Sequence, residues 1–195
     1  MAGFLLGSIP WGLWIGRARG IDLRSAGSRN IGATNAFRVM GPRWGGLVFL
    51  LDAAKGTAAA LLSAQLPTQI AAGFAAILGH VFSPWVRFRG GRGVATSLGV
   101  FLALLPAPTL VAFGVWIVLV ALSGRVSVGS VGAALAYPFL AAAFLAGRDH
   151  RIALLVMASL VTALIVARHL PNIRRILSGT EPRTFGRKDA GGGAA

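Results

Sequence analysis

Seven apolar segments follow one another along the chain, separated by stretches rich in arginine, glycine and small polar residues. Several of them approach the ~20 residues that a helix needs to cross the hydrocarbon core of a bilayer. Because a backbone in lipid must satisfy its own hydrogen bonds, repeated apolar segments of this length predict a bundle of transmembrane helices. The segments cover residues 1–16, 44–64, 67–83, 94–106, 108–123, 127–146 and 151–168.

The fourth and fifth segments could form one helix or two. Residues 94–123 are too long for one span at ~1.5 Å per residue and short for two, and Pro106-Ala107-Pro108 is a suitable break. With seven spans and the N-terminus outside, sixteen basic residues fall inside, Arg148 and Arg151 fall outside, and Lys55 lies within a span. Merging the two segments would place the basic tail outside, against the positive-inside rule. We therefore predict an all-α, polytopic bundle of seven transmembrane helices with a cytoplasmic C-terminus.

The composition separates this chain from soluble domains. Charged residues make up 12% of it, against roughly 25% in an average soluble domain, and the mean hydropathy is +0.73. A net charge of +14 could indicate nucleic-acid binding, but so apolar a chain offers no basic soluble face. Positive-inside bias and contact with anionic lipid or substrate explain the charge instead. The absence of cysteine excludes disulfides and thiolate nucleophiles.

We expect a single membrane domain over residues 1–188, followed by a disordered glycine- and alanine-rich tail over residues 189–195. The first apolar segment has neither a basic n-region nor a small-residue cleavage site, so it is predicted to be a retained helix rather than a signal peptide. No internal repeat is evident in the sequence, which argues against an inverted-repeat transporter.

The loop after the first segment, residues 20–38, is far longer than a connection between two helices requires. Gly27 and Gly32 would let its backbone turn N–H groups inward as an anion-binding nest. Arg38 adds a cation that can bind an anion through two hydrogen bonds. The loop is therefore a candidate phosphate site, with a solvated basic loop as the alternative. Its neutral donors are Ser28, Asn30, Thr34 and Asn35.

A second candidate phosphate site lies just before the fourth apolar segment. Gly90, Gly91 and Gly93 surround Arg92 and lead into the N-terminus of a predicted helix. Free N–H groups and the helix dipole favour anions at such a position. The segment is not a P-loop, because the Gly-Lys-Ser/Thr ending is missing. The alternative is a flexible turn with membrane-facing arginines.

Ionisable residues also occur within and beside the predicted spans. Asp52 and Lys55 can pair on one helix face, and since charges inside a membrane are expensive, a structural ion pair and a direct catalytic role are equally open. His80 is predicted to orient or pack. His169 lies at the inner face near Asn172, where a general base or hydrogen-bond organiser is possible. An interfacial histidine among lipid-facing arginines is the alternative.

Taken together, these segments resemble the PlsY-type family, the bacterial acyl-phosphate:glycerol-3-phosphate acyltransferases. The likeness runs in order along nearly the whole chain. It comprises Gly7-Ser8-Ile9-Pro10, Asp22, Gly27-Ser28, Asn30, Gly32, Thr34-Asn35, Arg38, Asp52, Lys55-Gly56, Gly79-His80, Pro84, Phe88, Gly90-Gly91, Gly93-Val94-Ala95-Thr96, Arg168-His169, Asn172-Ile173, Arg175, Gly179 and Glu181.

The resemblance implies a seven-span enzyme of the bacterial inner (plasma) membrane, active at the cytoplasmic face. Such an enzyme transfers an acyl chain from acyl phosphate to the sn-1 hydroxyl of glycerol 3-phosphate, giving lysophosphatidic acid and inorganic phosphate. It implies no metal or other cofactor, no nucleic acid, and a functional monomer whose partners are its two substrates and membrane lipid. The family also lacks the His-x4-Asp motif of other glycerolipid acyltransferases, and no aspartate follows any histidine here at that spacing.

The same resemblance implies roles for individual residues of this sequence. The residues implied to be catalytic are Ser28, Arg38, His169 and Asn172. Those implied to bind substrate are Asn30, Thr34, Asn35, Lys55, Gly90, Gly91, Arg92, Gly93 and Ser127. Those implied to be structural are Asp52, His80 and Glu181.

Three positions depart from the family pattern. Arg29 stands in place of the usual glycine, Arg92 in place of the usual lysine, and Leu170-Pro171 in place of a more polar pair. Two other classes compete with the acyltransferase: a transporter or channel for small organic anions, and a non-catalytic lipid-binding scaffold. The basic residues gather at one predicted face and the outer half offers few polar residues for a path, which favours the acyltransferase.

Overall fold

The computed structural model describes residues 1–184, and all regular structure in that range is helical. The predicted tail over residues 189–195 lies outside the described residues. The α-helices are α1 (Ala2–Ser8), α2 (Trp11–Ala18), α3 (Ala33–Met40), α4 (Pro42–Ala60), α5 (Leu66–Val81), α6 (Val94–Leu104), α7 (Pro106–Ser123), α8 (Val126–Phe144), α9 (Arg151–Arg168) and α10 (Leu170–Leu177), with a 3-10 turn, η1, at Pro84–Val86.

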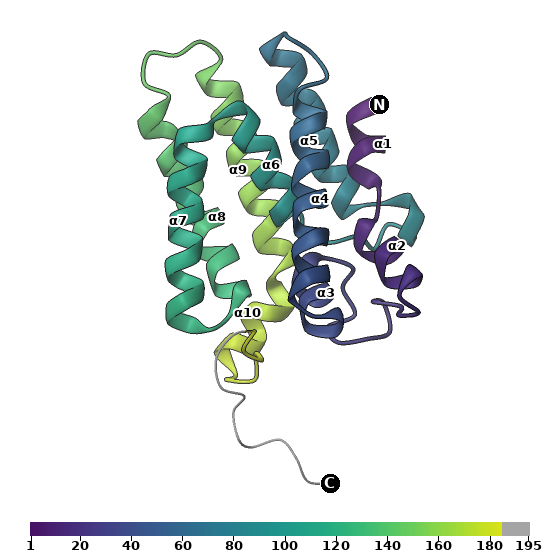
Figure 1. Ribbon diagram of the computed structural model, residues 1–195. Helices are drawn as coiled ribbons and strands as arrows, with labels where there is room; N and C mark the ends of the chain where they lie inside the picture. The colour runs from purple at the N-terminus through teal and green to yellow at the C-terminus, as the bar shows by residue number, and fades with distance from the viewer. Residues whose placement is uncertain (185–195) are drawn as a thin grey trace, which may run out of the picture.

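The bundle has two groups of helices joined by α6. Figure 1 shows α1 to α5 on one side and α7, α8 and α9 on the other, with α6 between them. Helix α6 packs closely against α4, and α7 packs against α8. The largest apolar core lies among α5 to α9 and includes the fully buried Ile77, Val100 and Leu145. Two smaller apolar clusters, one around Leu13 and Ile31 and one around Leu23, Ala36 and Val48, pack the loop before α3 and α3 itself.

The connections between helices lie at the two ends of this bundle. In Figure 1 the lower end gathers α3, α10 and the turn between α7 and α8. The N-terminus and the connections from α4 to α5 and from α8 to α9 lie at the upper end. All predicted phosphate-binding segments thus come from loops and helix ends rather than from the middle of long helices.

The first apolar segment is broken into two short helices rather than forming one. Helix α1 ends at Ser8, Ile9 is extended at φ −57° and ψ 118°, and α2 begins at Trp11. Proline explains the break, because Pro10 has no N–H to donate and pushes the residue before it out of the helical region.

The boundary between the fourth and fifth segments exists, but it lies two residues earlier than predicted. Helix α6 ends at Leu104, Leu105 alone links the helices, and α7 begins at Pro106. Proline suits the first turn of a helix, where its missing N–H has no intrahelical role. Helices α3 and α10 were not predicted as separate elements, and α3 lies inside the long first loop.

Four helical stretches are long and apolar enough to cross a membrane: Leu66–Val86, Pro106–Ser123, Val126–Phe144 and Arg151–Arg168. Helix α4 has a comparable length but carries Asp52 and Lys55, and α6 is apolar but short. Length and composition by themselves therefore support four of the seven predicted spans.

Close contact between α4 and α6 fixes the start of α6. A side chain on Gly56 would overlap the backbone of Thr96, and one on Gly99 would overlap the backbone of Ala53. Thr57 adds a hydrogen bond of 2.9 Å from its hydroxyl to the Gly99 carbonyl. Small residues at facing positions let two helices approach in this way.

Candidate active site

A single buried amide shapes the long loop before α3. The Asn35 Oδ1 accepts a hydrogen bond of 2.8 Å from the Ser28 N–H. Its Nδ2 donates to the carbonyls of Leu23, Ala26 and Asn30 at 3.1, 3.0 and 2.8 Å. Asn35 was predicted to bind substrate, but its donors and its acceptor are occupied within the protein. Its role in the structure is to hold the loop in place.

The predicted anion nest in this loop is largely satisfied internally. Gly27 has the left-handed φ of 58° that such a turn requires, whereas Gly32 has a φ of −77°. The Gly32 N–H donates to the Asn30 Oδ1 at 2.8 Å, and the Ser28 N–H is taken by Asn35. The loop can therefore offer side chains and the N-terminus of α3 to an anion, rather than these two backbone N–H groups.

The glycine loop before α6 serves mainly to place Arg92. Gly90 and Gly91 donate their N–H groups to the two carbonyls at the end of α5, at 3.0 and 3.2 Å. A side chain on either glycine would overlap His80. Gly90 and Gly91 were predicted to bind substrate, but their N–H groups are not available for it. Gly93, with a φ of 86°, turns the chain into α6.

A buried polar cluster of Asp52, Lys55 and His80 lies beside the glycine loop. The Lys55 Nζ lies 2.7 Å from the Asp52 Oδ1, as the spacing of the two residues predicted. It also donates a hydrogen bond of 2.6 Å to the Ile9 carbonyl at the break between α1 and α2. The His80 Nδ1 lies 3.6 Å from the same Asp52 oxygen. Lys55 was predicted to bind substrate, but the structure commits its ammonium to Asp52 and the helix break.

His169 is held in one tautomer at the end of α9. Its Nδ1 lies 2.8 Å from the Ile165 carbonyl, which can only accept, so Nδ1 carries the hydrogen and Nε2 is left as an acceptor. Burial, followed by the positive charge of Arg92, lowers the pKa of His169 to about 4. The imidazole is therefore neutral at physiological pH.

Glu181 joins the segments at the lower end of the bundle. One carboxylate oxygen accepts hydrogen bonds from the Ser127 hydroxyl at 2.9 Å and the Asn172 amide at 2.7 Å. The other accepts from Arg175 at 2.7 Å. Burial raises the pKa of Glu181, but these three hydrogen bonds outweigh it and the net shift is downward. Ser127 and Asn172, predicted to bind substrate and to catalyse, thus bind this carboxylate.

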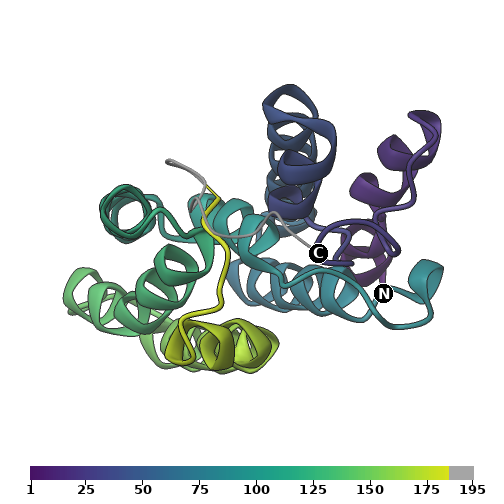
Figure 2. The ribbon, with the colours of Figure 1, turned by 90° about the horizontal axis from the view of Figure 1, so that it is seen from below.

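The segment after α10, residues 181–184, crosses the lower end of the bundle, and we call it the strap. Figure 2 shows it running from α10 toward the opposite group of helices. The Thr184 N–H donates to the Gly124 carbonyl at 2.7 Å. The Arg38 Nη2 donates to the Thr184 hydroxyl at 2.9 Å and to the Pro182 carbonyl at 3.4 Å. Arg38, predicted to be catalytic, is therefore engaged by the strap.

These elements surround a polar pocket. Helices α3 and α6 both begin at its wall, and neither has a side-chain cap on its first turn. Arg92 lines the pocket without a hydrogen bond to the part of the chain that the structure describes, and burial lowers its pKa to about 10, so it stays charged. The pocket is lined by Ser28, Asn30, Gly32, Ala33, Thr34, Asn35, Phe49, Asp52, His80, Arg92, Gly93, Val94, Ala95, Trp116, Val126, Ser130 and His169.

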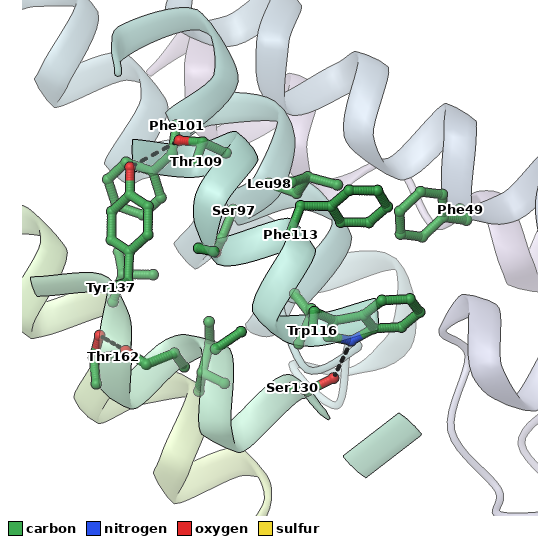
Figure 3. Close-up of a pocket in the computed structure, with 16 residues that line it drawn as sticks. Phe49, Ser97, Leu98, Phe101, Thr109, Phe113, Trp116, Ser130, Tyr137 and Thr162 are labelled. Carbon is green, nitrogen blue, oxygen red and sulfur yellow. Dashed lines mark hydrogen bonds between the residues drawn. The ribbon is translucent and has the colours of Figure 1, made fainter. Parts of the chain in front are cut away.

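An apolar chamber adjoins the polar pocket. Figure 3 shows Trp116 and Ser130 at one end of it and Tyr137 with Phe101 at the other. Phe49, Val94, Trp116 and Ser130 line both spaces. The other residues of the chamber are Ser97, Leu98, Phe101, Thr109, Ala112, Phe113, Ala133, Ala134, Tyr137, Val161, Thr162 and Ile165.

The structure brings together most of the predicted site and adds residues that the sequence reading missed. Phe49, Trp116 and Ser130 were not predicted. Ser130 carried a weak signal, because it lies one helical turn from Ser127, whereas an aromatic residue in an apolar segment gives none. Within residues 1–184, no three histidine, cysteine or acidic side chains are grouped closely enough to hold a metal ion. The predicted residues that line the polar pocket are Ser28, Asn30, Thr34, Asn35, Asp52, His80, Arg92, Gly93 and His169.

The structure is thus an all-helical, apolar bundle in which a polar pocket that contains Arg92 adjoins an apolar chamber. The family model described as glycerol-3-phosphate acyltransferase matches residues 1–179. The chain belongs to the glycerol-3-phosphate acyltransferase family.

Individual relatives extend over nearly the whole chain. The glycerol-3-phosphate acyltransferase of Trichlorobacter lovleyi is 45% identical over 184 residues, covering 92% of this chain and 93% of the relative. That of Geobacter sulfurreducens is 41% identical over 184 residues, with 92% and 93% covered. The crystal structure of PlsY (YgiH), an integral membrane glycerol 3-phosphate acyltransferase, in its glycerol 3-phosphate form is similar with a TM-score of 0.86 and 40% identity, covering 94% of this chain and 92% of that one. Its lysophosphatidic acid form has a TM-score of 0.84 at 39% identity, with the same shares covered.

Proposed function

We propose that this chain transfers an acyl group from acyl phosphate to the sn-1 hydroxyl of glycerol 3-phosphate, releasing lysophosphatidic acid and inorganic phosphate. The observation that carries the proposal is the junction between the polar pocket and the apolar chamber. An acyl phosphate has an anionic head and a long apolar chain, and it needs both spaces at once. The relative PlsY (YgiH) has been solved in a glycerol 3-phosphate form and in a lysophosphatidic acid form, which supports glycerol 3-phosphate as the acceptor and lysophosphatidic acid as the product.

The phosphate groups would be held at the starts of α3 and α6. The first N–H groups of an uncapped helix lack intrahelical partners and point along a dipole that favours anions. Both helices begin at the polar pocket, where Ala33, Thr34 and Ala95 line it. Arg92, which has no hydrogen bond to any residue from 1 to 184, adds a planar cation suited to phosphate.

The reaction needs alignment more than activation. The glycerol hydroxyl oxygen attacks the acyl carbonyl carbon, the bond from that carbon to the phosphate oxygen breaks, and phosphate leaves. Phosphate is a good leaving group, so holding the two substrates in register supplies most of the required rate enhancement. Ser28 would stabilise the negative charge that develops on the carbonyl oxygen.

His169 would orient the attacking hydroxyl. Because its Nδ1–H is bound to the Ile165 carbonyl, its Nε2 is the acceptor for the hydroxyl proton. The phosphate oxygen released from the acyl carbon takes the electron pair of the broken bond, so it is a far stronger base than the His169 imidazole, whose pKa is about 4. The departing phosphate is therefore the better final acceptor, and His169 acts mainly by accepting the hydrogen bond that aligns the hydroxyl.

Arg38 would contribute after it leaves the strap. Its guanidinium lies close enough to Arg92 to help lower the pKa of that residue, so both cations act on the same region. An arriving phosphate is a stronger acceptor than the Thr184 hydroxyl and the Pro182 carbonyl. Asn172 and Ser127 would act through Glu181, by fixing the segment beside His169.

The chain would cross the membrane seven times, with its N-terminus outside and the polar pocket at the cytoplasmic face of the bacterial inner membrane. The distribution of basic residues supports this orientation. The active unit would be a monomer.

The test is phosphate release from palmitoyl phosphate by the purified protein in detergent, with and without glycerol 3-phosphate. We expect release that depends on glycerol 3-phosphate and continues with a chelator present. Palmitoyl-CoA in place of palmitoyl phosphate should give no lysophosphatidic acid. Transfer from palmitoyl-CoA but not from palmitoyl phosphate would overturn the proposed donor while leaving the family assignment intact.

A further inference from the structure

The apolar chamber ends at a closed floor. Phe101 and Tyr137 face one another there, with ring centroids 4.4 Å apart. The Thr109 hydroxyl donates to the Leu105 carbonyl at 2.6 Å, so the Tyr137 hydroxyl, 2.9 Å away, donates to Thr109. Figure 3 shows these three side chains together. Phe101 and Tyr137 are 4% and 6% exposed, so the floor is packed on its far side.

The depth of the chamber follows from its three helices. Val94 on α6, Trp116 on α7 and Ser130 on α8 stand where the chamber meets the polar pocket. On each helix, the floor residue lies two turns further into the bundle, at Phe101, Thr109 and Tyr137 respectively. Two turns of an α-helix rise about 10 Å. On all three helices, the floor residue therefore lies about 10 Å along the helix from the junction residue.

We propose that Phe101 and Tyr137 determine which acyl-chain length this enzyme prefers. The inference rests on the proposed function, because the chamber is assigned to the acyl chain through its continuity with the polar pocket. A chain bound by its head at Arg92 enters the chamber past Trp116, and its far carbons meet the two rings. The packed rings cannot yield easily, so longer chains lose contact or must leave the chamber.

The hydroxyl pair keeps the floor rigid. In apolar surroundings a Tyr137 hydroxyl without a partner would be costly, and Thr109 on α7 supplies the acceptor. The bond therefore fixes the Tyr137 ring on α8 relative to α7. The ring supplies the bulk that blocks the chain, whereas the hydroxyl only holds the ring, and these two contributions can be separated by substitution.

The experiment compares lauroyl, palmitoyl and arachidoyl phosphate as donors for the wild type, Tyr137→Ala and Phe101→Ala, with kcat/KM measured by phosphate release. Removing either ring should raise the ratio of kcat/KM for arachidoyl to lauroyl phosphate about tenfold, since pocket walls discriminate between chains by such factors. Ala112→Leu should lower that ratio, because Ala112 lines the chamber between its junction and its floor on α7.

Two variants serve as controls. Tyr137→Phe keeps the ring and removes the hydroxyl, so it should preserve the wild-type order of donors. Phe139→Ala removes an aromatic ring from the same helix at a position 79% exposed, and it should also leave that order unchanged.

The possible outcomes distinguish the role of the floor from the acyltransferase activity itself. If Phe101→Ala and Ala112→Leu are both active and keep the wild-type order of donors, the floor does not determine chain length, although the acyltransferase activity stands. This conclusion holds even if Tyr137→Ala fails to fold. Failure of the folded wild type to release phosphate from any of the three donors would overturn the proposed function, and the floor with it.

Discussion

The polar pocket and the apolar chamber share four residues but are built in opposite ways. The pocket is assembled from loops and helix ends that lie far apart in the sequence, from Ser28 to His169. Specific hydrogen bonds hold it in shape, above all those of Asn35 and Glu181. The chamber is lined mainly by regularly spaced side chains of α6, α7, α8 and α9, with Phe49 from α4. Apolar packing holds most of them, and a few hydrogen bonds, such as that between Tyr137 and Thr109, fix the rest.

We therefore expect substitutions in the two regions to have different effects. In the polar pocket a charged or amide side chain acts through hydrogen bonds of defined geometry, so removing it should cost orders of magnitude in rate or much of the stability. In the chamber, apolar side chains of similar volume can replace one another at small cost. Substitutions there should change which donor is preferred more than how fast the preferred donor reacts.

The largest effect is expected at Arg92. Arg92→Ala removes the cation that lines the polar pocket without a protein partner, so we expect kcat/KM for palmitoyl phosphate to fall about 10²- to 10³-fold, as for other preorganised transition-state donors. Arg92→Lys keeps the charge but not the planar fork, and it should retain most of the activity. Equal losses in both variants would show that the fork, rather than the charge, is required.

His169 should follow. His169→Gln keeps a hydrogen-bonding side chain but not the imidazole, and we expect kcat to fall about 10- to 100-fold, at the lower end of acid–base contributions, since the departing phosphate takes the proton. The wild-type kcat should show no decrease attributable to His169 between pH 8 and pH 5, because its pKa is about 4. A decrease that follows protonation near pH 6 and persists in His169→Gln would identify phosphate as the titrating group.

The same pKa predicts how stability depends on pH. Between pH 4 and pH 6.5 the unfolded chain binds a proton at His169 that the folded chain does not, so the free energy of unfolding should fall as the pH is lowered through this window. The loss is about 3 kcal/mol at most. Thermal unfolding in detergent at pH 7 and pH 4.5 measures it, and His169→Gln should lose less than the wild type. His150→Gln, at an exposed position, is the control.

Asn35 tests whether the long loop depends on one side chain. Asn35→Ala leaves the Ser28 N–H and three carbonyls without their partner, so we expect the loop or the whole fold to be destabilised by roughly 2 kcal/mol. Hydrogen exchange of residues 23–32 should increase even if activity at saturating substrate is retained. Asn30→Ala, which removes only the bond to Gly32, should have a smaller effect; a loop equally protected in both variants would contradict the role given to Asn35.

The smallest functional effect is expected at the strap. Thr184→Val removes the hydroxyl that competes with phosphate for Arg38, so KM for palmitoyl phosphate should fall about two- to fivefold, which corresponds to the lower part of the range of about 0.5–1.5 kcal/mol for one hydrogen bond. In an Arg38→Ala background, which should itself lose most activity, Thr184→Val should have no effect on KM. An effect that persists without Arg38 would place the role of Thr184 elsewhere.

Arg29 tests the cost of a left-handed backbone conformation in the loop. It is exposed and has a left-handed φ of 58°, a conformation that costs a non-glycine residue roughly 1 kcal/mol or more. Arg29→Gly should therefore raise the melting temperature slightly or leave it unchanged, with activity retained. A clear loss of activity would show that the Arg29 guanidinium itself contacts substrate.

Sequence patterns located the helices well because each pattern has a local cause. The apolar segments matched α4 to α9 within a few residues, and the prolines at 106 and 108 indicated the break between α6 and α7. The break between α1 and α2 at Pro10 was not predicted, because residues 1–16 were expected to form one helix. Helix α3 was missed because its short sequence, polar at the start, lies inside a loop rich in glycine. The ion pair of Asp52 and Lys55 was predicted from spacing alone, since residues three apart on a helix are neighbours.

The chain itself determined the chemistry of this protein: apolar segments long enough for lipid, arginines and glycines at loop positions suited to phosphate, and a histidine beside them. The tertiary structure decided which of those groups remain available. Asn35, Ser127 and the Asn172 amide nitrogen are bound by partners within the protein, and Arg38 is held by the strap. Trp116 and Ser130 join the site from predicted helices, but their own positions carried little or no local signal. A hydrogen-bonding group can be used only once at a time, and only the folded chain shows which partner takes it.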